Sequence, residues 1–498
     1  MPAAPAALGM AFSYYAYPFL ISLRSGKYLI LGLLFLLIIA VSLFRVLKLY
    51  PGEKSKAVFI TSILVAAAAV GFSLGIASRR SVIDTPEFGL ASNRVIAVSG
   101  TLIEDPRTLH GGSGLGALEL SESSGQGGLR ASAKGIITVF FPAESIPRLR
   151  EFGRGALIYI DGTVSIAEMG PLFNASSVHV VRPASGLEQF RTSLRMKLLE
   201  KFRYRQDRKY EAGEAPVWGP LASALLLGMR DDLAVDLSEG FRNSGCAHIL
   251  ALSGMHLAIL SAVLAFLIKR PLGIKGASIA GALFIVLYVF VAGSQPSLVR
   301  SAIVYFMGTI SLWGFLKGKP FSLLCMAFII QLIFQSRTGL SLSFILSYLA
   351  LTGILTMGES FHRIFRGRLP EILSQSLSSS LGAFIVTAPV IVLYFNVLRP
   401  IGIIAGLFAA PLSALFMVLA LIALVVSFLP FALWSVLDFI LVQVYRLFKL
   451  SVTLAGQAPG MSFSNPIPVL IFAIISWLLI LYIQSRDYGR RSSIGSFN

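Results

Sequence analysis

Two histidines, His248 and His256, stand eight residues apart in an apolar part of the chain, with Ser253 and Gly254 between them. Ionisable groups are costly in hydrocarbon, so histidines at membrane depth are candidate functional residues. In a continuous helix, His248, Ser253 and His256 would project within an arc of roughly 140°. The alternative is a histidine that only packs a helix and bonds a neighbouring carbonyl. The combination of His, Ser, Gly and His favours a functional cluster.

Pro296, Ser297 and Arg300 form a second polar group. Proline suits the first turn of a helix, which puts Ser297 and Arg300 on one face. The guanidinium fork binds phosphate in a bidentate way, so Arg300 is expected to face a polar pathway. The alternative is an arginine that snorkels to the membrane interface.

Two more polar residues stand in apolar segments. Ser347 is a candidate pathway residue, although serines in membrane helices are usually packing residues. Asp438 is the clearest acid within an apolar segment and is a candidate charge partner for Arg300 or a histidine.

Motifs of soluble enzymes do not occur in the sequence. There is no glycine-rich phosphate loop with lysine, which excludes a P-loop motor. No His/Asp cluster has metal-ligand spacing, so neither a metal-dependent nuclease nor a bound metal or cofactor is expected. Ser253 and His256 could act as nucleophile and base of an intramembrane hydrolase, but no third orienting group is evident.

The composition predicts an integral membrane protein. Hydrophobic residues make up 55% of the chain, charged residues 13%, and the mean hydropathy is +0.78. Apolar stretches of about 20 residues, long enough to cross hydrocarbon, recur and predict an α-helical bundle of about ten or eleven spans. These stretches are Tyr28–Leu47, Ala57–Ala77, Ile249–Ile268, Ile274–Ala292, Leu298–Leu316, Phe321–Phe334, Leu340–Met357, Leu377–Phe395, Ile401–Leu429, Phe431–Phe448 and Ile467–Ile483.

The net charge of +18 is explained largely by topology, because cytoplasmic loops of membrane proteins collect Lys and Arg. The distribution of positive loops predicts a multi-pass protein of the bacterial inner (plasma) membrane. The tail 486–498 is then cytoplasmic, although Arg79 and Arg80 fall on the opposite side and oppose this orientation.

Residues 92–183 form a different kind of domain, set between an N-terminal transmembrane hairpin (1–80) and the bundle (217–485). Short β-branched runs with turn residues predict a small β-barrel or sandwich outside the cytoplasm. The expected strands are Val95–Leu102, Ile136–Phe141, Ala156–Ile166 and Ser177–Val181, and Leu109–Leu129 is expected to be a Gly/Ser-rich connection. The domain carries as many acidic as basic residues, so it has no net positive footprint for nucleic acid.

A basic amphipathic helix is predicted over 186–210. Its apolar face repeats at three- and four-residue spacing, through Leu187, Phe190, Leu194, Leu198 and Phe202. Such helices usually lie on a membrane surface. The alternative is a collar that attracts DNA phosphates to a pore mouth. The candidate phosphate contacts, to lipid or to DNA, are Arg191, Arg195, Lys197 and Lys201.

Four segments together resemble the competence domain of ComEC-type DNA-uptake proteins: Leu225–Arg230, Phe241–His256, Ala292–Arg300 and Phe344–Ile354. The resemblance extends weakly through Thr387–Pro389 and Ala409–Pro411, and it implies that the β domain is OB-like. It also implies an inner-membrane channel for single-stranded DNA in natural transformation. The residues expected along the pathway are His248, Ser253, Gly254, His256, Pro296, Ser297, Arg300 and Ser347.

The sequence departs from the family pattern in three places. The metallo-β-lactamase-like nuclease domain of many members does not follow the last span, so that activity is expected to be absent or on another polypeptide. Ile345 stands where a Gln is common, and Gly406 where an Asn is common. The family also implies a cytoplasmic ATPase or helicase and an external DNA receptor, and a homo-oligomer is possible. The alternative function is transport of another polyanion or of a lipid on the same fold.

Overall fold

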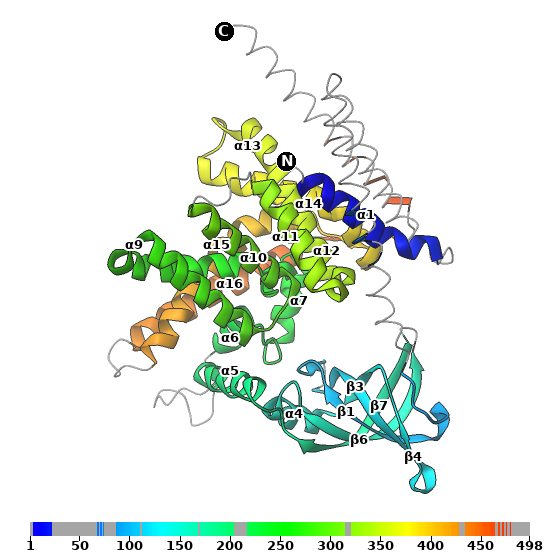
Figure 1. The fold of residues 1–498 in the computed structure, drawn as a ribbon. Helices are drawn as coiled ribbons and strands as arrows, with labels where there is room; N and C mark the ends of the chain where they lie inside the picture. The colour runs from blue at the N-terminus through cyan, green and yellow to red at the C-terminus, as the bar shows by residue number, and fades with distance from the viewer. Residues whose placement is uncertain are drawn as a thin grey trace.

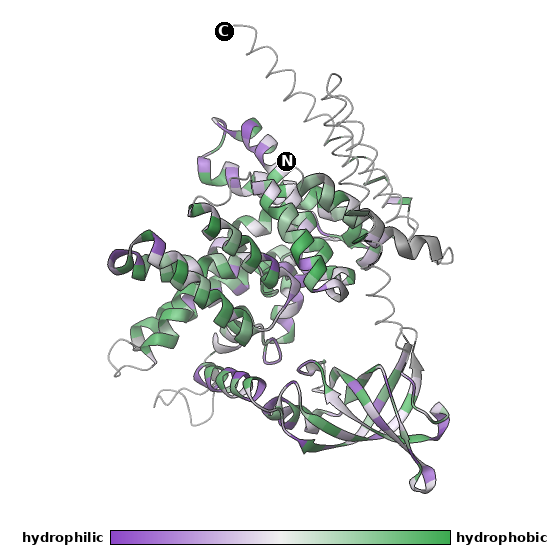
Figure 2. Ribbon diagram, in the orientation of Figure 1, coloured by the Kyte–Doolittle hydropathy of each residue, from purple (hydrophilic) through white to green (hydrophobic). Residues whose placement is uncertain are grey.

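The computed structural model describes residues 3–21, 86–109, 112–167, 170–203, 217–313, 320–427 and 434–463, with single residues near 67–73 and 467–479. Within these ranges the chain forms a β-barrel and a helical bundle, with the helix α5 (Leu187–Arg203) running between them (Figure 1). The bundle is largely apolar, whereas apolar and polar residues alternate along the barrel strands (Figure 2).

The barrel has five main strands. Its strand order is β1-β6-β7-β5-β3, and β3 pairs back with β1 to close the ring. Neighbouring strands are antiparallel except for the parallel pair β5–β7, and the helix α4 (Ile146–Phe152) connects β5 to β6. This arrangement confirms the predicted OB-like barrel. The strands are β1 (Val95–Leu102), β3 (Gly114–Gly125), β5 (Ile136–Phe141), β6 (Leu157–Ala167) and β7 (Gly170–Arg182), with the short β2 (Arg107–Thr108) and β4 (Arg130–Ser132) beside β3.

The strand β3 corrects the prediction that 109–129 is only a connection. Its glycines and serines lower its strand propensity, but it pairs with both β1 and β5. Leu118 and Leu120 are buried in the barrel core while Glu119 is exposed. Gly116 is required there, because a Cβ atom would lie 2.9 Å from the Phe141 ring. The strand β3 therefore forms because of its pairing and packing with neighbouring strands, and not because of its own strand propensity.

The bundle follows most of the predicted spans. Five helical stretches are long and apolar enough to cross a membrane, namely Gly254–Ala292, Leu342–Phe365, Glu371–Phe395, Ile401–Val426 and Val436–Gly456. These stretches make the protein a multi-pass membrane protein. They correspond to α9 (Gly254–Ala292), to α12 (Leu342–Gly353) with a π-helical turn and α13 (Glu359–Phe365), and to α14 (Glu371–Phe395), α15 (Ile401–Val426) and α16 (Trp434–Gly456).

Shorter helices complete the described bundle. They are α6 (Gly219–Leu227), α7 (Val235–Asn243), α8 (Ala247–Leu250), α10 (Pro296–Leu312) and α11 (Pro320–Phe334). The predicted spans Tyr28–Leu47, Ala57–Ala77 and Ile467–Ile483, and the tail 486–498, lie wholly or mostly outside the described residues. Of the predicted hairpin 1–80, the structure describes mainly an additional helix, α1 (Ala3–Ile21), which packs against α11.

The helix α9 is two spans joined at Gly273. That glycine has φ +65° and ψ −178°, which breaks the helical backbone two residues after Pro271. The break falls between the predicted spans Ile249–Ile268 and Ile274–Ala292. Glycine suits this position because side chains with a Cβ rarely adopt a positive φ.

The helices α12 and α14 cross where Gly353 meets Gly382. A Cβ atom on Gly353 would lie 2.1 Å from the carbonyl oxygen of Gly382, and one on Gly382 would lie 2.6 Å from the carbonyl oxygen of Gly353. Only glycine permits this backbone contact, which resembles the small-residue crossings of other membrane helices. The crossing fixes the position of α12, which carries Ser347.

We expect Gly353→Ala to force α12 away from α14 and to lower the free energy of unfolding by roughly 1–3 kcal/mol. The measurement is the thermal unfolding midpoint of the purified protein in detergent. Gly308→Ala is the matched control, because nothing lies within 4 Å of its Cβ position in α10. Equal midpoints for the two variants would show that the glycine crossing does not hold these helices together.

Candidate functional site

The two histidines of the first cluster do not share a helix. The helix α8 ends at Leu250, Ala251 is extended, and α9 begins only at Gly254. The side chain of His248 is exposed, whereas that of His256 is fully buried. The prediction of one continuous helical face is therefore wrong. The unbroken apolar run Ile249–Leu252 gives no hydropathy signal for this break.

Asn243 and Ser244 end the helix α7. Gly245 follows with φ +74°, and its Cβ position lies 3.0 Å from the Cα atom of Gly402. This glycine therefore admits the start of α15.

Ser253 and His256 form a reciprocal cap at the start of α9. The Ser253 hydroxyl accepts the backbone N–H of His256, and the backbone N–H of Ser253 donates to His256 Nδ1 at 3.2 Å. The Ser253 hydroxyl also lies 2.9 Å from Nδ1. This is a capping box in which histidine takes the place of the usual Glu or Gln. It gives the serine and the histidine a structural role that needs no catalysis.

Three interruptions of helical backbone converge beside this cap. Gly228 ends α6 with φ +73°, and its Cβ position lies 2.7 Å from Leu252 and 3.6 Å from Gln295. Leu252 belongs to the break before α9, and Gln295 to the break before α10. Non-helical backbone at membrane depth is tolerated only inside protein or along a polar cavity. The three breaks therefore bring non-helical backbone together at one place in the helical bundle.

Two side chains donate hydrogen bonds to carbonyl groups beside these breaks. The Ser297 hydroxyl donates to the carbonyl of Leu252 at 2.6 Å, and the Gln331 amide donates to the carbonyl of Pro296 at 2.9 Å. Tyr348 in turn donates to Gln331 at 2.8 Å. Sequence reasoning missed Gln331, although a lone glutamine inside the apolar stretch Phe321–Phe334 was a signal for it. Pro296 and Ser297, two of the residues predicted along the pathway, therefore belong to this hydrogen-bond network.

Arg300 lies at the centre of this network. It donates to the carbonyl and the hydroxyl of Ser347 and, at 3.3 Å, to the hydroxyl of Ser301. Its guanidinium carbon lies 5.8 Å from the centroid of the Tyr348 ring. The residue is 7% exposed, so the structure does not support snorkelling to an interface.

The guanidinium also explains Gly254. A Cβ atom at Gly254 would lie 2.5 Å from the Ser301 hydroxyl and 3.3 Å from a terminal nitrogen of Arg300. The glycine therefore admits the neighbouring helix α10 at the N-terminus of α9. The structure brings Gly254, Arg300 and Ser347 together, while His248 lies apart from them on α8.

Asp438 is not the partner of Arg300. One of its carboxylate oxygens accepts the indole N–H of Trp218 at 2.9 Å. Among the described residues no carboxylate lies within ion-pair distance of Arg300, whose contacts are two serines, a carbonyl and an aromatic ring. The expectation that Asp438 balances this charge is therefore wrong in this structure. Arg230 is a further positive charge near this site, and it acts electrostatically on His256.

A separate ionic junction joins the barrel to α5. Asp105, in the loop between β1 and β3, pairs with both Arg191 and Arg195. Arg191 also pairs with Glu188 and donates to the carbonyl of Phe290 near the end of α9 at 2.8 Å. Burial lowers the pKa of Arg195, and the charge of Asp105 opposes that shift. The predicted phosphate contact is not supported for these two arginines, and it stays a prediction for the exposed Lys197 and Lys201.

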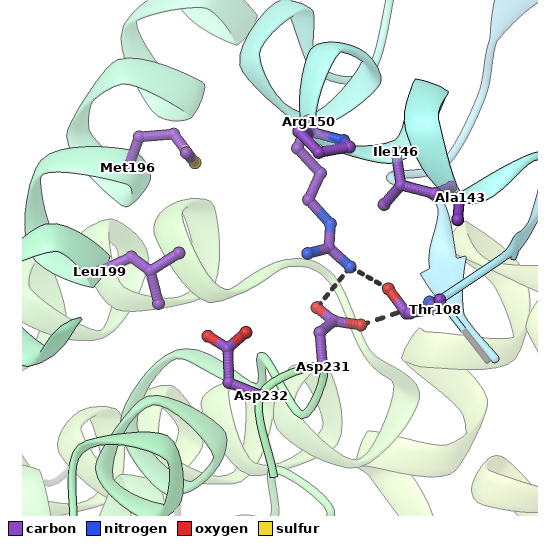
Figure 3. A pocket seen from close by; sticks show the side chains of 10 residues that line it. Thr108, Ala143, Ile146, Arg150, Met196, Leu199, Asp231 and Asp232 are labelled. Atoms are coloured by element: carbon purple, nitrogen blue, oxygen red, sulfur yellow. Dashed lines mark hydrogen bonds and ion pairs between the residues drawn. The ribbon is translucent and has the colours of Figure 1, made fainter. Parts of the chain in front are cut away.

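A second ionic contact borders a small cavity between the barrel and the bundle. Arg150 of α4 pairs with Asp231 at 2.7 Å, and the backbone N–H of Thr108 donates to the same carboxylate at 3.2 Å (Figure 3). The cavity has a volume of about 290 Å³, and Met196 and Leu199 of α5 line its other side. Both contacts hold the barrel loops against the membrane domain.

No group of three or more His, Cys, Asp or Glu side chains that could hold a metal ion occurs in the described ranges. Cys246 and Cys325 are both buried as free thiols.

Comparison with known proteins places most of the bundle in one family. A family model described as Competence protein matches residues 225–487, just over half of the chain. ComE operon protein 3 of Bacillus subtilis (strain 168) is 28% identical over 200 residues, which are 38% of this chain and 24% of that protein. An uncharacterized protein of Aquifex aeolicus (strain VF5) is 29% identical over 209 residues, 40% of this chain and 47% of that protein.

A third relative is the uncharacterized protein YcaI of Escherichia coli (strain K12), 27% identical over 213 residues, or 39% of this chain and 27% of that protein. The matches thus span between about a quarter and a half of the length of these curated relatives. No solved structure matches the chain.

We expect Ser253→Ala to remove the cap of α9 and to lower the free energy of unfolding by about 1 kcal/mol. Ser253→Thr keeps a capping hydroxyl and should retain most of the stability. Thermal unfolding of both variants in detergent measures this difference. We also expect no labelling of the wild-type protein by a serine-reactive fluorophosphonate. Labelling that disappears in Ser253→Ala would instead show an activated nucleophile and support the intramembrane hydrolase.

Proposed function

The chain belongs to the competence protein family, and on that premise we propose that it forms a membrane channel that passes single-stranded DNA into the cytoplasm during natural transformation. The family supports a role in DNA uptake. The finer statement, a channel for a single strand, rests on the chemistry of the network around Arg300.

The observation that carries the proposal is a buried guanidinium with only neutral partners among the described residues. Removing a charge from water costs several kcal/mol unless it is paired. A chain that keeps such a charge inside its membrane bundle is expected to use it. A DNA strand presents one negative phosphate per nucleotide, and arginine binds phosphate oxygens with its planar fork.

The surrounding backbone supports the same conclusion. The helices α9 and α10 both begin beside Arg300, at Gly254 and Pro296. The N-terminus of a helix carries a partial positive charge, and interrupted helices in transporters direct such ends at anionic groups. In the closed arrangement the contacts of Arg300 are supplied by Ser347 and Ser301. We propose that a phosphate takes the place of Ser347 when the pathway opens.

Several features of the system follow as proposals from the family. The barrel would lie outside the cytoplasm, and the C-terminus inside. A cytoplasmic ATPase or helicase would supply energy and an external receptor would deliver DNA, since the chain itself is proposed to be neither motor nor nuclease. A separate nuclease would degrade the other strand, and assembly into a homo-oligomer is compatible with this arrangement.

Transport of another polyanion or of a lipid on the same fold is the second candidate. The buried charge of Arg300 suits any phosphate-bearing substrate, so the network alone does not select DNA. Flux of labelled single-stranded DNA, compared with labelled polyphosphate and phospholipid, in vesicles that contain the purified protein separates these candidates.

We expect deletion of the gene in a competent host to abolish transformation and the wild-type chain to restore it. Arg300→Ala should reduce the restored frequency by at least about tenfold, because one charge-assisted contact contributes roughly 1.5–3 kcal/mol. Arg300→Lys keeps the charge without the fork and should recover part of the loss. Arg368→Ala, which removes an exposed charge, is the matched control.

Protein level in the membrane, measured by immunoblot, must be equal in all strains. Ser347→Ala provides a second variant in case Arg300→Ala does not fold. Unchanged transformation after deletion would reject DNA uptake and favour the other substrates. Full activity of Arg300→Ala at normal protein level would remove Arg300 from the pathway.

A further inference from the structure

The first half of the helix α5 buries charged side chains and exposes apolar ones. Arg191 and Arg195 face protein, since their side chains are 6% and 15% exposed. Two of its large apolar side chains face outward, because Leu187 is 75% exposed and Phe190 is 56% exposed. In water the opposite arrangement is favoured, since burial of apolar surface stabilises and burial of charge costs free energy.

The outward face of α5 combines apolar and basic side chains. At 100° per residue, Leu187, Phe190, Leu194, Lys197 and Lys201 fall within an arc of about 80°. Leu194 is partly covered by the bundle, whereas both lysines are exposed. The apolar residues occupy the first two turns and the lysines the last two.

The position of α5 places this face at the level of the lipid headgroups. The helix follows β7 of the barrel, and its other end enters the bundle core, where Leu199 and Phe202 are each 2% exposed. It therefore connects an alternating polar and apolar barrel to an apolar membrane domain (Figure 2). A segment that makes this connection must cross the interface between water and hydrocarbon.

We propose that the outward face of α5, defined by Leu187, Phe190, Lys197 and Lys201, is a binding surface for anionic phospholipid. Leu187 and Phe190 enter the boundary between headgroups and acyl chains. The lysine stems lie along the surface, and their ammonium groups contact lipid phosphates. The ionic junction of Asp105 with Arg191 and Arg195 then fixes the barrel at a defined height above the bilayer. This inference is independent of which substrate crosses the bundle.

Lipid suits this face better than nucleic acid does. A surface for single-stranded DNA combines a positive groove with aromatic platforms. Here the two arginines nearest to Phe190 are withdrawn into ion pairs with Asp105, and Leu187 offers no ring for stacking. The outward face of α5 therefore consists of an apolar patch followed by lysines, which is the composition of an interfacial helix.

The test uses the full chain in vesicles with single spin-labelled cysteines. The labelled positions are Phe190→Cys on α5, Leu283→Cys on a membrane span and Val181→Cys on the barrel, at residues that are 56%, 68% and 60% exposed. Cys246 and Cys325 are buried, so the wild-type chain serves as the unlabelled control. Collision with oxygen reports hydrocarbon, and collision with a water-soluble nickel chelate reports water.

We expect the label at 190 to favour oxygen over the chelate, as the label at 283 does, while the label at 181 favours the chelate. A label at 190 that behaves as the one at 181 overturns the proposal. Protection of that label from the chelate only after addition of an oligonucleotide also overturns it and indicates a nucleic-acid surface instead.

The lysines are tested with a fluorophore at position 190 and brominated lipids as quenchers. We expect stronger quenching by brominated phosphatidylglycerol than by brominated phosphatidylcholine. Lys197→Gln should reduce this preference about fivefold, the effect of one cation near an anionic surface. Lys134→Gln on the barrel should leave it unchanged. Equal quenching by the two lipids in the wild-type chain would overturn the anionic part of the proposal.

Discussion

The buried positive charge of Arg300 is the constraint around which the described membrane domain is arranged. Its guanidinium is held by neutral oxygens of Ser347 and Ser301 and by the ring of Tyr348 rather than by a carboxylate of the described chain. Such contacts demand close helix approach, which explains the glycine at 254 and the crossing of α12 on α14. A carboxylate in the same place would neutralise the site, and the pathway would lose its attraction for anions.

The interruptions in the helices impose a second constraint, because every released carbonyl needs a donor where water is scarce. Ser297 supplies a donor for the carbonyl of Leu252, Gln331 bonds the carbonyl of Pro296 in the first turn of α10, and the Ser253–His256 cap satisfies the start of α9. The polar residues of the site thus have two tasks. They hold non-helical backbone in place, and in the proposed channel they would offer hydrogen-bonding groups to a passing phosphate. A substitution that affects transport can therefore act through either task.

The sequence predicts helices and strands correctly where neighbouring residues in the chain alone indicate which side chains will be buried. The β-branched runs of β1 and β5 predict the strand bounds that are observed, and the length of apolar stretches predicts most of the spans. The prediction from sequence fails where the structure of a segment depends on residues that are distant in the chain. The strand β3 depends on its two neighbours, and Arg191 is buried because Asp105, far away in the chain, pairs with it. The hydropathy pattern does not indicate the break before Gly254. However, Ser253 followed three residues later by His256 has the spacing of a capping box, which indicates a helix start.

The distribution of charge between the two domains decides where an anion is attracted most strongly. The barrel carries as many acids as bases, and its Asp105 pairs with two arginines of α5. OB-folds often bind oligonucleotides with the loop between their first two strands, but here that loop is engaged with α5 and with Asp231. The barrel therefore contributes little free positive charge near the bundle. In the described membrane domain, Arg300, Arg230 and the starts of α9 and α10 place positive charge at the interrupted helices, where the proposed pathway would attract an anion.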